Sequence, residues 1–240
     1  MFKKVFFLTF INISLVTSSL FAQKTLYPKW VDNTYHAMSL DEKIGQLFMV
    51  AAYSNKDEQH VKNLEILIEN HHIGGLIFFQ GGPVREINIT NRLQAKSKTP
   101  LWIGMDAEWG LGMRLDSTMN FPKQMTLGAI QNNDLIYDMG AEIARQAKLL
   151  GIHVNFAPVV DVNNNIKNPV IGYRSFGEDK ENVAQKGVAY MKGMQENGLM
   201  ANAKHFPGHG DTDSDSHMTL PVIKHDTTRL NEIELYPFKK

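Results

Sequence analysis

The sequence alternates short apolar runs with amphipathic segments of helical length. Four runs have the length of strands and end in glycine, acids or amides (74–82, 100–108, 153–162 and 199–208), and residues 46–52 form an earlier member. Apolar side chains stand at helical spacing in 133–150 and 180–197, and each segment is followed by a glycine suited to a C-terminal cap. Apolar strands that alternate with helices are typical of parallel sheets. The alternation therefore predicts an α/β fold.

Polar residues gather where the predicted strands end. Asp106 and Glu108 close one run, Asp161 closes the next, and Lys204 and His205 close the last. A (β/α)8 barrel, the TIM barrel, builds its active site from these positions, whereas the glycine fingerprint of a dinucleotide-binding sheet is absent after the first strand. We count about five strands and a full barrel needs eight. The sequence thus predicts only about the first five β/α units of a barrel.

Composition narrows the classes of partner. The chain has 240 residues, 43% of them hydrophobic, with a formal net charge of zero and no cysteine. That balance suits one globular domain and argues against nucleic acid or an anionic membrane as the main partner. The absence of cysteine excludes disulfides, thiolate metal sites and cysteine nucleophiles.

The first residues have the layout of a secretory signal peptide. A basic start is followed by an apolar run and a small-residue exit that ends at Ala22. The apolar run is short for a membrane span. We therefore expect residues 1–22 to be removed, residues 23–240 to form the mature domain, and the protein to be exported to the periplasm or outside the cell.

The stretch KHFPGHGDTDSDSHMTLP (204–221) is dense in histidine and aspartate and favours either metal binding or acid/base chemistry. His205 and His209 have the helical zinc spacing, but Pro207 between them prevents a shared helix face. A loop-built metal site that uses His217 with Asp211 or Asp213 stays open.

The acid/base interpretation rests on Asp215-Ser216-His217. A carboxylate two residues away can accept the ring N–H of His217 and orient the ring for proton transfer. Taken alone, the tripeptide favours a structural alternative, a solvated loop whose aspartates cap the next helix.

The same stretch resembles the signature of family 3 glycoside hydrolases, in the β-N-acetylglucosaminidase branch. Further matching motifs follow the family order over residues 39–240, namely LDEKIGQLF, GMDAEWGLGMR, FPKQMTLGA, NFAPVVDVNNN and NPVIGYRSFGED. The resemblance implies a (β/α)8 barrel that removes terminal β-linked N-acetylglucosamine with retention of configuration, acts on cell-wall or chitin-type oligosaccharides, and needs no metal or organic cofactor.

The resemblance also implies roles for individual residues. His217 would be the acid/base, with Asp215 as its orienting partner. The family's nucleophile is an aspartate after the seventh strand, so we expect it beyond Lys240. The implied sugar-binding residues are Asp106, Arg114, Arg174, Lys204 and His205.

Asp106, Arg174 and Lys204 each have a structural alternative, which for Asp106 is to cap a helix. Lys204 could pair with Asp106, Arg174 could hold its own loop through Glu178, and Asp161 could hold the asparagine-rich loop that follows it. His209 is expected to be loop scaffolding.

One motif departs from the pattern of the family's cytosolic recycling enzymes. DAEWGLGMR replaces their DQEGGRVQR-like stretch, which makes Trp109 a candidate for the pocket rim. Three other functions stay open, a β-glucosidase of the same family, a metallohydrolase, and a non-catalytic sugar-binding module.

Overall fold

The computed structural model describes residues 28–215, 218 and 220–240. The predicted signal peptide, residues 1–22, and the predicted acid/base residue His217 lie outside the described residues. The chain divides into two compact units, Met1–Lys43 and Ile44–Lys240, which are described separately.

The described part of the first unit holds helix α1 (Lys29–Ala37) and the start of α2 (Leu40–Gly45). Ser39 and Glu42 form a reciprocal cap at the start of α2. The backbone N–H of Ser39 donates to Glu42 Oε2 at 2.8 Å, and the N–H of Glu42 donates to Ser39 Oγ at 3.2 Å. This is the capping box that the sequence predicts.

The second unit is built on a parallel sheet whose five strands lie side by side in sequence order. They are β1 (Met49–Ala52), β2 (Gly75–Phe78), β3 (Trp102–Met105), β4 (Val154–Asn155) and β5 (Met200–Ala201). A doubly wound sheet reverses its strand order part-way, whereas a barrel adds each strand to the same edge. The order has no reversal, and the predicted α/β fold with five β/α units is confirmed.

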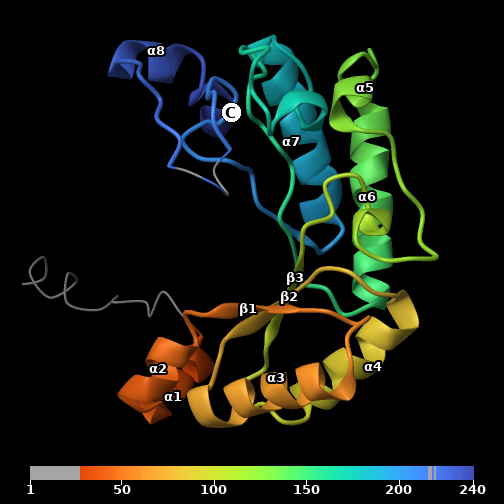
Figure 1. Cartoon of the computed structure of the whole chain (residues 1–240), viewed down its shortest axis with the longest axis vertical. Coiled ribbons are helices and arrows are strands. Elements are labelled where there is room, and N and C mark those ends of the chain that lie inside the picture. The colour runs from red at the N-terminus through yellow and green to blue at the C-terminus, as the bar shows by residue number, and fades with distance from the viewer. Residues whose placement is uncertain (1–27, 216–217, 219) are drawn as a thin grey trace, which may run out of the picture. The chain divides into compact units, whose positions relative to one another are not determined.

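Helices connect the strands and lie along one side of the sheet (Figure 1). Because parallel crossovers are right-handed, strands added to one edge place their helices on one face. The helices and 3₁₀ turns are α3 (Glu58–His71), α4 (Pro83–Gln94), η1 (Leu111–Met113), α5 (Gln124–Gly128), α6 (Asp134–Leu149), η2 (Gly172–Arg174), α7 (Lys180–Glu196), α8 (Thr227–Glu232) and α9 (Tyr236–Lys239).

Helices α6 and α7 match the two amphipathic segments predicted from spacing. Most residues of their predicted apolar faces are buried, and small residues let the two helices approach closely. A Cβ on Gly193 would lie 2.1 Å from the carbonyl oxygen of Tyr137, so only glycine fits there. Gly151 and Gly198, the predicted caps, both have the positive φ of a left-handed C-terminal turn.

Strands β4 and β5 are shorter than the apolar runs that predict them. Beyond Asn155 and Ala201 the pairing continues irregularly, through a single parallel bridge between Val159 and Lys204. The N–H of Val160 donates to the Lys204 carbonyl at 2.8 Å, and the N–H of Lys204 donates to the Pro158 carbonyl at 3.1 Å. The ends of both runs are therefore loops held against each other, which brings their polar residues together.

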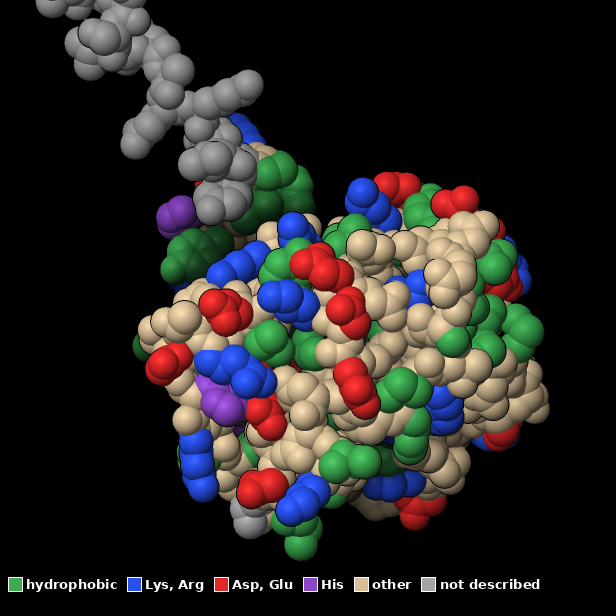
Figure 2. Space-filling view, turned by 90° about the horizontal axis from the view of Figure 1, so that it is seen from above, with side chains coloured by type: hydrophobic (Ala, Val, Ile, Leu, Met, Phe, Trp, Pro, Cys, Tyr) green, Lys and Arg blue, Asp and Glu red, His purple; other side chains and the backbone are tan. Residues whose placement is uncertain are grey.

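Acidic and basic side chains are interspersed on the face drawn in Figure 2, and neither sign of charge forms a large patch there. This agrees with the zero net charge. Of the helices in the described part of the chain, none has both the length and the apolar character that crossing a membrane requires.

Candidate active site

Buried hydrogen bonds hold the loop that follows β3. Asn155 of β4 pairs with the backbone of Ala107, accepting from its N–H at 3.0 Å and donating to its carbonyl at 3.2 Å. The hydroxyl of Tyr190, on α7, is 3.2 Å from the carbonyl oxygens of Ala107 and Glu108. Asp106 and Glu108 flank Ala107, so these contacts fix where both carboxylates stand.

Lys204 lies between the two carboxylates. Its Nζ is 2.6 Å from Asp106 Oδ1 and 2.9 Å from Glu108 Oε1. On the other side of Asp106, Arg114 donates from Nε to the Asp106 carbonyl at 2.9 Å, and its Nη2 is 3.4 Å from Oδ2. Asp106 keeps 22% of its side-chain surface exposed, so it can still accept bonds from a ligand.

Arg174, from η2, forms a two-pronged pair with Glu108. Its Nε donates to Oε2 at 2.9 Å and its Nη2 donates to Oε1 at 2.7 Å. The idea that Arg174 holds its own loop through Glu178 is therefore wrong. Glu108 is the stronger partner because it is buried behind the guanidinium, where an ion pair is screened less than at the surface.

The charge states of this cluster follow from its pairs. Burial would raise the pKa of the Glu108 carboxyl, but Arg174 and Lys204 outweigh it and hold that pKa below its usual value. Burial likewise opposes the charge of Arg174, and the Glu108 carboxylate raises the pKa of the guanidinium. The site therefore presents fixed charges, which suit the hydroxyls of a sugar through charge-assisted hydrogen bonds.

Asp161, at the end of the β4 run, binds the histidine loop. Its Oδ2 is 2.7 Å from His205 Nδ1, and its carboxylate also accepts from the N–H of His205 and, at 2.6 Å, from the N–H of His209. The alternative that Asp161 holds the asparagine-rich loop is wrong. Its buried carboxylate instead places His205, whose Nε2 is 3.3 Å from Arg174 Nη2. Because a guanidinium only donates, this Nε2 acts as the acceptor.

His209 is buried beside His205 and pairs through Nδ1 with the Thr212 hydroxyl. Asn168, from the loop after β4, donates to the His209 carbonyl at 2.6 Å. These contacts are those of a residue that holds a loop, as the sequence predicts.

The predicted acid/base pair is described only in part. Asp215 accepts at its carbonyl from the N–H of Met218 at 3.0 Å, whereas His217 lies outside the described residues. The structure thus brings together all five predicted sugar-binding residues. It adds Glu108 and Asp161, which the sequence places at strand ends but gives no partner.

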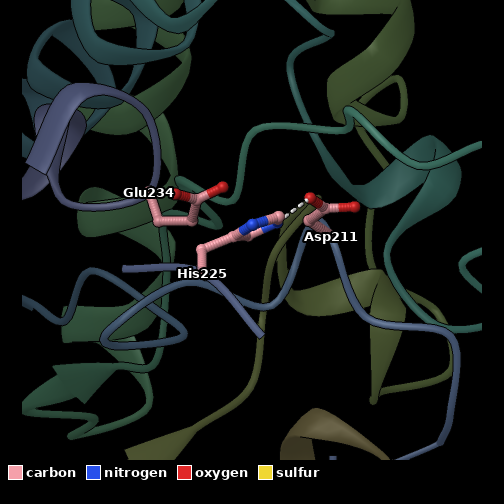
Figure 3. Close-up of side chains that lie close together, drawn as sticks. All are labelled: Asp211, His225 and Glu234. Carbon is pink, nitrogen blue, oxygen red and sulfur yellow. Dashed lines mark hydrogen bonds and ion pairs between the residues drawn. The ribbon is translucent and has the colours of Figure 1, made fainter. Parts of the chain in front are cut away.

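A group outside this site has the composition of a metal centre. Asp211, His225 and Glu234 each offer a ligand atom within 4.8 Å of the others (Figure 3). His225 Nε2 is 2.6 Å from Asp211 Oδ2, and Arg229 Nη2 donates to both carboxylates, at 3.3 Å to Asp211 and 3.2 Å to Glu234. The guanidinium supplies the positive charge that two close carboxylates need, so these residues fit an ion-pair network better than a metal site.

Similarity to known proteins agrees with this arrangement. The profile of the glycosyl hydrolase family 3 N terminal domain matches residues 39–240. Beta-hexosaminidase A of Pseudoalteromonas piscicida is 39% identical over 73% of this chain and 31% of its own length. The Beta-N-acetylglucosaminidase/beta-glucosidase of Cellulomonas fimi is 34% identical over 80% of this chain and 34% of its own.

A solved family 3 β-N-acetylglucosaminidase from Paenibacillus sp. str. FPU-7 superposes with a TM-score of 0.77 at 38% identity, over 85% of this chain and 40% of that one. The chain spans about a third of the length of each of the two curated relatives, as their coverages of 31% and 34% show. The match to the family profile and the shared fold lead to one conclusion: this chain belongs to glycoside hydrolase family 3.

Proposed function

We propose that the protein is a retaining β-N-acetylglucosaminidase that removes terminal β-linked N-acetylglucosamine from cell-wall or chitin-type oligosaccharides. The observation that carries this proposal is the paired-charge cluster of Asp106, Glu108, Arg174 and Lys204 at the carboxyl ends of the strands. Relatives named as hexosaminidases support the choice of sugar.

Within the proposed site, Asp106 is the main acceptor for sugar hydroxyls, because it is the more exposed of the two carboxylates and Lys204 orients it. Glu108 already accepts from Arg174 and Lys204, so it acts by holding these two cations in place. Arg114 and His205 complete the set of proposed hydroxyl partners.

In the proposed reaction, the aspartate expected beyond Lys240 attacks the anomeric carbon and the bond to the leaving oxygen breaks. His217 gives its proton to that oxygen, and Asp215 holds the ring. Water then attacks the anomeric carbon of the covalent sugar–aspartate ester, the bond from that carbon to the aspartate oxygen breaks, and His217 takes the proton of the water. We propose no cofactor, and we propose export by the segment 1–22.

The test replaces the proton donor in the complete gene product. His217→Ala should lower kcat for 4-nitrophenyl N-acetyl-β-glucosaminide by about 10³-fold, within the range of general acid/base catalysis, and change KM little. The control is His71→Ala, an exposed histidine at the end of α3, which should keep normal turnover. Near-normal turnover of His217→Ala would exclude this residue as the acid/base.

A β-glucosidase of the same family is the second candidate, because the Cellulomonas fimi relative is named for both activities. Hydrolysis rates for the 4-nitrophenyl glucoside and N-acetylglucosaminide, measured on one preparation, separate the two. Binding of N-acetylglucosamine without hydrolysis of either compound would instead favour a sugar-binding module.

A further inference from the structure

The loop after β3 and the 3₁₀ turn η2 contact each other through two neighbouring pairs of residues. Glu108 pairs with Arg174, and the residues next to them, Trp109 and Tyr173, place their rings 6.5 Å apart at an angle of 60°. Lys123 completes this second contact, with its Nζ 3.0 Å from the centre of the Trp109 ring and 5.1 Å from that of Tyr173. We call these three residues the aromatic rim. It lies directly beside the ion pair of the proposed sugar site.

The backbone at Lys123 is fixed in this place by its neighbour. Gln124 is fully buried, donates from Nε2 to the Val159 carbonyl at 2.9 Å and accepts from the Val159 N–H at 3.4 Å. The side chain of Lys123 therefore starts beside the loop that follows β4 and reaches over Trp109. Partial burial lowers the pKa of the Lys123 ammonium, and the nearby Glu108 carboxylate opposes that shift.

Lys123 differs from the other cations of the site in the groups that it contacts. Arg114, Arg174 and Lys204 each lie within 3.4 Å of a carboxylate oxygen. Among the residues that the structure describes, the Lys123 ammonium contacts two rings but makes no hydrogen bond or ion pair. A cation over a ring gains about 0.5–2 kcal/mol and keeps its N–H donors available for an anion.

We propose that Lys123 is a specificity-determining residue that binds a carboxylate on the leaving group of the substrate. This inference rests on the proposed function, in which the sugar to be removed occupies the strand ends at Asp106 and Lys204. The leaving group extends outward from that sugar, past the aromatic rim, where Tyr173 is 58% exposed. Trp109 and Tyr173 hold the ammonium in place, so that it is ordered before the substrate arrives.

The experiment uses the complete gene product and two substrates that differ in one charge, 4-carboxyphenyl N-acetyl-β-glucosaminide and its methyl ester. Lys123→Met keeps a long side chain on Trp109 and removes the charge. It should lower kcat/KM for the acid about tenfold more than for the ester, the size of one charge-assisted hydrogen bond at a partly exposed site. Lys123→Arg, which keeps the charge, should retain the preference for the acid.

The matched control is Lys56→Met. Lys56 also lies over an aromatic ring, 3.8 Å from the centre of Tyr53, but follows β1. It should leave the acid-to-ester ratio of the wild type unchanged. In the wild type, that ratio should also fall as salt is added, because screening weakens an exposed charge pair.

Equal losses for the two substrates in Lys123→Met, or the same change of ratio in Lys56→Met, would overturn the role of Lys123 and leave the proposed glycosidase activity intact. If the wild type hydrolyses the ester but shows no preference for the acid, the inference about Lys123 is also wrong. Hydrolysis of neither substrate by the wild type would overturn the proposed function together with it.

Discussion

Glu108 and Glu86 are both almost completely buried, 1% and 0% exposed, yet their surroundings differ. Glu108 accepts hydrogen bonds from Arg174 and Lys204, and its pKa lies below the usual value. Glu86, on α4, has no hydrogen-bond partner for either carboxyl oxygen among the described residues, and burial raises its pKa to about 8. The partners of a buried carboxyl group, more than its burial, decide its charge.

The position of Glu86 at the start of a helix does not keep its carboxyl group ionised. Glu86 stands in the first turn of α4, where the helix dipole favours a negative charge by about 0.3–1 kcal/mol. A rise of the pKa from 4.5 to about 8 reflects a larger opposing effect, since one pKa unit is about 1.4 kcal/mol. The carboxyl group of Glu86 is therefore mostly protonated in the folded protein at neutral pH.

The largest effect is expected when Glu108 loses its charge. Glu108→Gln leaves Arg174 and Lys204 without their shared carboxylate, and should lower the free energy of unfolding by about 3 kcal/mol, as for a broken buried pair. Urea unfolding of the wild type and of Glu108→Gln, each as the complete gene product at pH 7, measures this loss of free energy of unfolding.

The control for Glu108→Gln is Glu142→Gln on α6, where the carboxylate pairs with both Nε and Nη2 of Arg145 at the surface. Its loss should stay below about 1 kcal/mol because exposed pairs contribute little. Equal losses at the two sites would show that burial does not distinguish these pairs.

A smaller effect of opposite sign is expected at Glu86. Its folded pKa lies above the unfolded value, so its stabilising contribution is complete below about pH 4.5 and is lost as the pH rises through about 8. Glu86→Gln cannot ionise and should be more stable than the wild type by about 2 kcal/mol at pH 6, with the difference shrinking toward pH 5 and growing toward pH 8. Urea unfolding at a series of pH values tests this, and a difference that does not change with pH would contradict it.

The smallest effect is expected one turn further along α4. The hydroxyl of Thr90 is buried with no hydrogen-bond partner among the described residues. Thr90→Val keeps the shape and removes the unpaired group, so the protein should gain about 1 kcal/mol. Unlike the gain at Glu86, this gain should be the same at pH 5 and pH 8, which makes Thr90→Val the uncharged control for Glu86→Gln.

Much of the fold could be predicted from local patterns. The apolar runs of strand length, the spacing of Ile136, Met139 and Ile143, and the glycines at 151 and 198 all depend on residues close in sequence. The lengths of β4 and β5 could not, because their apolar runs continue into loops whose hydrogen bonds are made between distant segments.

For the site residues too, the sequence predicts the local features and misses the contacts between distant segments. The position of a polar residue at a strand end is a local property, and the sequence alone is enough to identify Asp106, Asp161 and Lys204 by it. The partner of Arg174 is not local, since Glu178 is four residues away and Glu108, the true partner, is 66 away. The unpaired state of Glu86 is likewise invisible in the sequence, where a glutamate in the first turn of a helix indicates an exposed residue.

The sequence by itself determined which elements form and which side chains stand at the strand ends, because helical spacing, strand spacing and caps act over a few residues. Only the tertiary structure decided which charges meet. Those pairs join loops that follow different strands, and the energy of each carboxylate depends on how much water it loses and which cations replace that water.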